Sequence, residues 1–228
     1  MKHNWAMTAT LRSPERIVVL QNISWDLYES LLFAHRDRSV PRFTYDKGQL
    51  EIMSPSAEHE QLKETVTLLV NIAAEEMGIN LQGFGSTTFR RADLDRGFEP
   101  DACFYIENLG RVRGKKELEL KIDPPPDLVI EIDITSSSLD KLGIMAQLRV
   151  PEVWHYSKKA WRILKLERKG YQEKLESGAL AGLTSEAINR LLEESRTLEP
   201  LAWVRRVREL IRTSVDRRSR QQPGPQAH

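Results

Sequence analysis

The spacing of apolar residues predicts two helices in the first third of the chain. After Ser24, apolar residues recur at helical spacing, and the pattern stops before Pro41, so we expect a helix that Ser24 caps. A longer helix is expected over 57–77, because one apolar stripe runs along this segment. Gly78 follows it as a typical C-terminal cap.

Short segments with β character lie around the longer helix. The segments 42–45 and 49–53 flank Asp46-Lys47-Gly48, a tight-turn signal, and therefore predict a hairpin. Further strands are expected in the β-rich part that follows the helix, over 80–84, 86–90 and 102–106.

The most apolar strand of the chain is expected at Asp127–Thr135 and should be central in its sheet. The segment 107–126 before it is polar and ends in three prolines, which cannot sit inside a sheet. Ser136–Ser138 supplies candidate N-caps for a helix over 139–149. The remaining chain predicts a hairpin, a short strand and two helices, over 153–156 with 160–167, near Tyr171, and over 185–194 and 201–215.

This order of elements predicts an α/β (α+β) fold with a mixed central sheet flanked by helices, an N-terminal β-hairpin and C-terminal helices. We expect a disordered leader over 1–16, one domain over 17–215 and a disordered basic tail over 216–228. A phosphate-binding loop is not supported, because Gly83-Phe84-Gly85 lies between two strands with no helix start behind it.

Composition describes a globular protein, with 40% hydrophobic and 29% charged residues. No apolar run approaches the roughly 18 residues that a membrane span needs, so no membrane association is expected. The single cysteine, Cys103, excludes an intramolecular disulfide and a cysteine-based zinc site, which fits a reducing cytoplasm.

The net charge of +1 conceals a basic C-terminal segment, where arginines crowd the chain from Leu201 onward. Such a segment could contact an anionic partner such as nucleic acid. For this segment alone we favour a solvated helix face and a frayed terminus.

Two carboxylates stand in or beside apolar strands and carry the first indication of chemistry. Asp101 precedes the strand at 102–106, and Glu131 lies inside Leu-Val-Ile-Glu-Ile. Buried carboxylates are costly unless a cation or hydrogen bonds compensate them. Side by side, they would form an oxygen-only pocket suited to Mg²⁺ or Mn²⁺, as phosphodiester cleavage requires.

Asp101 after Pro100 has a structural alternative, in which it starts a strand and caps a turn. Glu131 is harder to explain without a partner.

An ordered series of four motifs resembles the Uma2 family of the PD-(D/E)XK nuclease superfamily. The motifs cover Leu50–Pro55 followed by His59, Glu99–Asp101, Asp127–Glu131, and Lys141 through Val150-Pro-Glu152-Val-Trp154. The resemblance extends over roughly residues 20–210, and the series is far more specific than any one motif.

The resemblance implies a metal-dependent endonuclease. Asp101 corresponds to the first metal-binding acid of the superfamily and Glu131 to the second, with the carbonyl of Ile132 as a further ligand of Mg²⁺ or Mn²⁺. The usual lysine two residues after the second acid is absent, because Asp133 occupies its place. Lys141, on the following helix, matches the position to which Uma2-like chains move this lysine.

Three further residues are possible accessories to this site. His59 matches a position that is commonly histidine in the family, and the neighbouring Glu58 could serve as a helix-borne acid. Asp133 would be either an added ligand or the partner that positions Lys141, because alternate strand residues share a face with Glu131.

Some observations depart from the family pattern or from a catalytic interpretation. Met145 and Arg149 replace residues that are often tyrosine and glycine in the family, which puts the local helix geometry in doubt. Three tryptophans are expected in the core rather than stacked on bases, namely Trp154, Trp161 and Trp203.

DNA is the expected substrate, and a homodimer is expected by analogy with nucleases that cut both strands. One alternative is a catalytically silent relative that binds nucleic acid or serves as an accessory protein. Another is a homo-oligomeric protein in which the acids only form salt bridges, for example with Arg90 and Arg91. If the acids only form such a network, added Mn²⁺ should leave the melting temperature unchanged.

Overall fold

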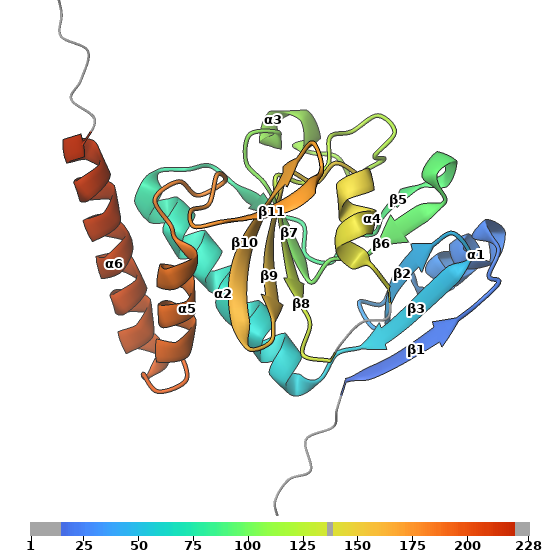
Figure 1. Cartoon of the computed structure of the whole chain (residues 1–228), viewed down its shortest axis with the longest axis horizontal. Coiled ribbons are helices and arrows are strands. Elements are labelled where there is room, and N and C mark those ends of the chain that lie inside the picture. The colour runs from blue at the N-terminus through green and yellow to red at the C-terminus, as the bar shows by residue number, and fades with distance from the viewer. Residues whose placement is uncertain (1–14, 136–138, 222–228) are drawn as a thin grey trace, which may run out of the picture.

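The computed structural model describes residues 15–135 and 139–221, with side chains described as far as Asp216. The described chain forms two β-sheets with helices packed around them (Figure 1). The first sheet is antiparallel, in the order β1 (Arg16–Leu20), β3 (Gln49–Ser54), β2 (Arg42–Asp46), β6 (Arg96–Phe98) and β5 (Phe89–Arg91).

The second sheet has six strands and is mixed. Its order is β11 (Gly170–Lys174), β10 (Ala160–Glu167), β9 (Glu152–Ser157), β8 (Leu128–Ile132), β7 (Ala102–Tyr105) and β4 (Gln82–Gly83). Only the β8–β9 pair is parallel. As expected for the most apolar strand, β8 lies in the interior of its sheet.

Helices cover both faces of the six-stranded sheet (Figure 1). The main core lies between one face and three helices, α2 (Ala57–Met77), α5 (Ser185–Glu194) and α6 (Pro200–Gln221). The short helices α3 (Leu109–Val112) and α4 (Lys141–Gln147) contribute to a second core on the other face. Helix α1 (Trp25–His35) packs against the five-stranded sheet, and a 3₁₀ turn, η1 (Ala92–Leu94), links β5 to β6.

Strand alternation in β8 decides which side chains can reach the site. Ile130 and Ile132 belong to the core under α2, whereas Val129 belongs to the core formed with α4. Because successive side chains point to opposite faces, Glu131 shares the α4 face with Val129. The acid in this strand is therefore directed toward the helix that begins at Lys141.

The predicted fold class is confirmed, and several predicted elements match closely. The helices at 57–77 and 185–194 form with the expected bounds. Ser24 caps α1, accepting a hydrogen bond from the backbone N–H of Leu27 at 3.2 Å. Gly78 ends α2 with a left-handed φ of 66°, the conformation that glycine adopts readily.

The N-terminal part of the chain holds two strands that we did not predict. Arg16, assigned to the leader, is the first residue of β1, which pairs with β3 along its whole length. Strand β6 contains Gly97 and little apolar sequence, and it forms because it pairs with both β2 and β5. Tertiary pairing overrides the weak local propensity of this segment.

The predicted strands at 80–84 and 86–90 are shorter in the structure, at Gln82–Gly83 and Phe89–Arg91. The predicted N-caps Ser136–Ser138 lie outside the described residues. The cap of α4 is Asp140, whose carboxylate accepts the N–H of Gly143 at 2.9 Å.

The last helix is longer than predicted. The segment from 216, expected to be a disordered tail, continues α6 through Gln221, and 222–228 lies outside the described residues. No proline or glycine interrupts the helix before Pro223. Arg208 and Arg212 pair with Glu76 of α2, so part of the basic face contacts α2 while it stays accessible to solvent, with 64% of the Arg212 side chain exposed.

Helix α4 forms despite its two departures from the family pattern. Met145 is fully buried in the second core. Arg149 follows the helix with a left-handed φ of 66°, a conformation that favours glycine. No helix among residues 15–135 and 139–221 is long and apolar enough to cross a membrane.

Gly97 is a position where the fold requires the absence of a side chain. A Cβ there would overlap the hydroxyl of the fully buried Tyr28 and lie 3.0 Å from two of its ring atoms. We expect Gly97→Ala to lower the free energy of unfolding by about 1–3 kcal/mol through overpacking, measured by urea denaturation. Gly110→Ala is the control, because nothing lies within 4 Å of its Cβ position. Equal stability of the two variants would contradict this account.

Candidate active site

The structure brings Asp101 and Glu131 to neighbouring strands. Asp101 precedes β7, and β7 pairs antiparallel with β8 so that Ala102 faces Ile130. One further step along this register sets Asp101 beside Glu131. Both residues are buried, with 2% and 3% of their surfaces exposed. Two buried carboxylates thus stand on or beside neighbouring strands, and each has its own cation partner, Arg42 for Asp101 and Lys141 for Glu131.

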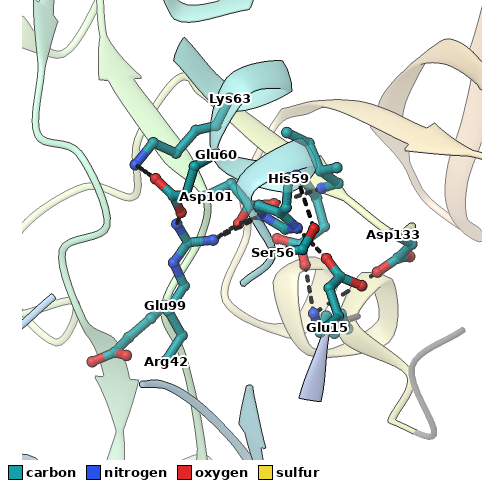
Figure 2. A network of polar contacts seen from close by, with 12 residues as sticks. Glu15, Arg42, Ser56, His59, Glu60, Lys63, Glu99, Asp101 and Asp133 are labelled. Atoms are coloured by element: carbon teal, nitrogen blue, oxygen red, sulfur yellow. Dashed lines mark hydrogen bonds and ion pairs between the residues drawn. The ribbon is translucent and has the colours of Figure 1, made fainter. Parts of the chain in front are cut away.

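The Asp101 carboxylate has polar partners on three sides. Its Oδ1 lies 2.7 Å from His59 Nε2 and also accepts from the guanidinium of Arg42. Its Oδ2 accepts the backbone N–H of Ile132 at 2.6 Å. Figure 2 shows His59 and Arg42 converging on this carboxylate. These contacts hold the Asp101 carboxylate in one orientation. They go beyond the alternative role considered above, in which Asp101 only starts a strand and caps a turn.

His59 and Arg42 are themselves held by further acids. His59 is completely buried on the first turn of α2, where Ser56 caps the helix, and its Nδ1 faces the carboxylate of Glu15. Arg42, from β2, donates from Nη2 to Glu60 at 2.7 Å. Burial alone would raise the pKa of Glu15, but hydrogen bonds from His59 and the Thr135 backbone outweigh it and lower the pKa.

Lys141 lies at the start of α4 with its ammonium surrounded by carboxylates. Its Nζ is 2.8 Å from Glu131, 3.5 Å from Glu51 and 3.8 Å from Asp133. Only 10% of its side chain is exposed. Burial would lower the pKa of Lys141, but the charges of Glu131, Asp133 and Glu51 outweigh it and raise the pKa. The lysine therefore reaches Glu131 from the following helix.

Asp133 stands between two partners. Its Oδ1 faces Lys141, and its Oδ2 lies 2.7 Å from His155 Nε2. Burial would raise the pKa of Asp133, but the hydrogen bond from His155 and the charge of Lys141 outweigh it and lower the pKa. Of the two roles considered for Asp133, this geometry supports partnership with Lys141.

The remaining predicted accessory residue, Glu58, takes a different position. It is exposed on the first turn of α2 and lines a cavity of about 610 Å³ together with Glu15 and Thr135. His59 rather than Glu58 supplies the contact from this turn to Asp101.

Comparison with known proteins identifies the family. Residues 25–198 match the family model of Uma2, described as "Putative restriction endonuclease". The chain belongs to the Uma2 family. Among solved structures, it is similar to "a putative nuclease belonging to DUF820" from Anabaena variabilis, with 14% sequence identity and a TM-score of 0.51. The match covers 75% of this chain and 99% of that chain, and at this identity it shows the fold alone. Among curated proteins, no relative matches the chain.

The site of this Uma2 protein includes charged residues that our sequence analysis did not assign to it. Glu51 of β3, 1% exposed, and His155 of β9, 6% exposed, each interrupt an apolar strand. This is the same signal that identified Glu131, so both could have been found. Arg42 begins its strand and Glu15 precedes β1. Neither of these two positions carries a comparable signal.

The acids do form ion pairs, as the alternative interpretation expects, but not with Arg90 and Arg91, the two arginines named as examples. Arg90 lies 3.2 Å from Glu29, and Arg91 binds Asp93 at 2.6 Å. The compensating cations in this Uma2 protein are Arg42 and Lys141 instead. All three tryptophans expected in the core are buried there, Trp154, Trp161 and Trp203.

The acidic side chains at this Uma2 site offer oxygen atoms, the donor type that a hard divalent cation prefers. Among the residues that the structure describes, no group of three or more His, Cys, Asp and Glu side chains is arranged to hold a metal. Mg²⁺, however, keeps several waters and needs only one or two protein carboxylates. Five carboxyl groups lie within 3.8 Å of Arg42 or Lys141, so formal negative charge is in excess: Glu51, Glu60, Asp101, Glu131 and Asp133.

Proposed function

We propose that this Uma2 protein is a metal-dependent endonuclease that hydrolyses phosphodiester bonds in DNA. One observation carries the proposal: Asp101, directly before β7, and Glu131, on the paired strand β8, are both buried, and the Lys141 ammonium lies 2.8 Å from Glu131. Family membership supports the reaction class, because the family is described as "Putative restriction endonuclease".

Asp101 and Glu131 would hold one Mg²⁺ or Mn²⁺, with the Ile132 carbonyl as a further ligand. When bound, such an ion polarises a phosphate and lowers the pKa of a bound water. His59, Arg42 and the Ile132 N–H keep the Asp101 carboxylate in place. Preorganisation of this kind avoids the cost of reorienting charged groups during the reaction.

Lys141 would act on the phosphate and the attacking water. Its ammonium is a donor only, so it can orient a water and offset the charge that develops on the phosphate oxygens. Because surrounding carboxylates raise its pKa, Lys141 is charged at neutral pH and acts as a donor. We assign proton acceptance to another group or to solvent.

Two further parts of the proposal concern the setting of the reaction. A homodimer would bring two sites to the two strands of a duplex. A reducing cytoplasm agrees with the single, buried Cys103.

The activity test uses the purified full chain with supercoiled plasmid, single-stranded DNA and RNA. We expect nicking of the plasmid with Mn²⁺ or Mg²⁺ and none with EDTA. Cleavage that persists undiminished in EDTA would overturn the metal requirement. Exclusive cleavage of RNA would overturn the choice of DNA.

A structural ion-pair network remains the competing interpretation, because each acid is already paired with a protein cation in the structure. Thermal melting separates the two interpretations. A cation that binds only the folded state at about 100 times its Kd stabilises by about 2.7 kcal/mol. We therefore expect saturating Mn²⁺ to raise Tm relative to EDTA, with Ca²⁺ and Na⁺ at matched ionic strength as controls. A Tm that is unchanged by Mn²⁺, with or without a duplex oligonucleotide, would favour the network.

A further inference from the structure

A row of polar side chains crosses three strands of the six-stranded sheet beside Lys141. In the β8–β9 register Glu131 neighbours His155, and in the β9–β10 register His155 neighbours Arg162. Paired residues on adjacent strands point to the same face. Elsewhere this face is apolar, with Val153 and Leu164 in the α4 core. Polar groups in such a setting are costly unless each has a partner.

The partners of His155 determine which ring nitrogen carries its proton. Arg162 Nη2 lies 3.2 Å from His155 Nδ1, and a guanidinium can only donate. His155 Nδ1 is therefore the acceptor, and Nε2 carries the hydrogen that is donated to Asp133 Oδ2 at 2.7 Å. Arg162 is itself oriented by Ser157, whose Oγ accepts from Nη2 at 2.6 Å.

The same contacts direct Asp133 toward the lysine. With Oδ2 held by His155, the other oxygen lies 3.8 Å from Lys141 Nζ. Asp133 is the most exposed of the three carboxylates around this ammonium, with 22% of its side chain accessible. Without the hydrogen bond from His155, this carboxylate could turn toward solvent. Its orientation therefore depends on a residue that does not touch Lys141.

We propose that His155 is a positioning residue that, oriented by Arg162, holds Asp133 against the Lys141 ammonium and thereby fixes Lys141 beside Glu131. This inference rests on the proposed function only where it concerns catalysis. The hydrogen-bonded arrangement itself can be tested on the protein without metal or substrate.

The kinetic arm of the test compares His155→Leu with His155→Gln, whose amide N–H can replace the donor to Asp133. His35→Leu on α1 is the matched control, because His35 is partly buried and bonds only a backbone carbonyl of its own helix in the described contacts. We expect His155→Leu to lower kcat for plasmid nicking about tenfold with KM unchanged, as for an interaction made in the transition state. His155→Gln should recover most of the rate.

A double variant tests whether the two residues act as one unit. Asp133→Leu/His155→Leu should lose no more activity than Asp133→Leu alone, because residues in one hydrogen-bonded unit are not additive. Additive losses would overturn the proposal. So would wild-type kcat in His155→Leu, provided that the wild-type protein nicks DNA.

The second arm needs no activity. Nitrogen-15 NMR of the metal-free protein should show His155 with its hydrogen on Nε2 and a slowly exchanging Lys141 ammonium. In His155→Leu the ammonium signal should be lost through faster exchange, and in His155→Gln it should remain. An unchanged Lys141 signal in His155→Leu, or a His155 hydrogen on Nδ1, would overturn the proposal. If the wild type cleaves no nucleic acid, the proposed function fails while this arm still decides the positioning role.

Discussion

Replacing Glu131 by glutamine is expected to reduce plasmid nicking on the order of 100-fold or more, the loss typical when one charge-stabilising group is removed from an active site. Glutamine has the same shape but lacks the charge. Lys141 retains Glu51 and Asp133 within 3.8 Å, so the fold should survive. The measurement is the initial rate of conversion of supercoiled to open-circular plasmid in Mn²⁺.

Glu167→Gln is the matched control, because Glu167 is an exposed acid on β10 that pairs with Lys174. It should nick at the wild-type rate. Circular dichroism and urea denaturation of both variants would confirm folding. Equal nicking by wild type, Glu131→Gln and Glu167→Gln would mean either that another protein in the sample cuts the DNA or that the site lies elsewhere.

Lys141→Met should produce the largest loss of stability together with a loss of nicking. Methionine keeps the length of the side chain but removes the charge that lies among three carboxylates. Removing one partner from a buried ion pair costs about 3–5 kcal/mol, because the other charge remains buried and uncompensated. Urea denaturation at pH 8 measures this effect.

Lys174→Met provides the comparison, since Lys174 pairs with Glu167 at the surface and exposed pairs contribute about 0–1 kcal/mol. The change in stability on adding Mn²⁺ provides a second measurement. Mn²⁺ should stabilise Lys141→Met more than wild type, because a cation then offsets charge that the ammonium no longer balances. Equal stability of the two lysine variants would show that the Lys141 ammonium contributes no more to stability than an exposed lysine.

The fold was predictable where local pattern and tertiary packing agree. The long helix has an apolar stripe, a serine cap and a terminal glycine, and it forms with the expected bounds. For strand β6 the local sequence pattern does not predict a strand, because β6 forms only through pairing with β2 and β5. The end of α6 was misjudged because a row of arginines resembles a solvated tail. The acids of α2 that bind Arg208 and Arg212 lie more than 130 residues away.

The candidate site was predictable where a charged residue stands in or beside an apolar strand, because that pattern is visible in the sequence. Asp101, Glu131 and Lys141 follow from motifs; the structure places Lys141 against Glu131, and Asp101 directly before the strand that pairs with β8. Glu51 and His155 carry the same signal of charge within an apolar strand, but each belongs to a segment that appears structural when considered alone. Arg42 could not be found from sequence, because its contact with Asp101 depends on how the two sheets dock.

The site draws on both sheets, with consequences for how the protein loses function. Glu51 and Arg42 come from the five-stranded sheet, whereas Glu131 and Lys141 belong to the six-stranded sheet and its covering helix. A shift of one sheet against the other would separate Glu51 from Lys141 and Arg42 from Asp101, and it would also disturb the second core, in which Phe89 and Phe98 of the five-stranded sheet pack with Val129 and Val153. The ion pairs of Arg42 and Lys141 and this shared core therefore hold the two sheets together, and we expect them to be lost in a single unfolding transition.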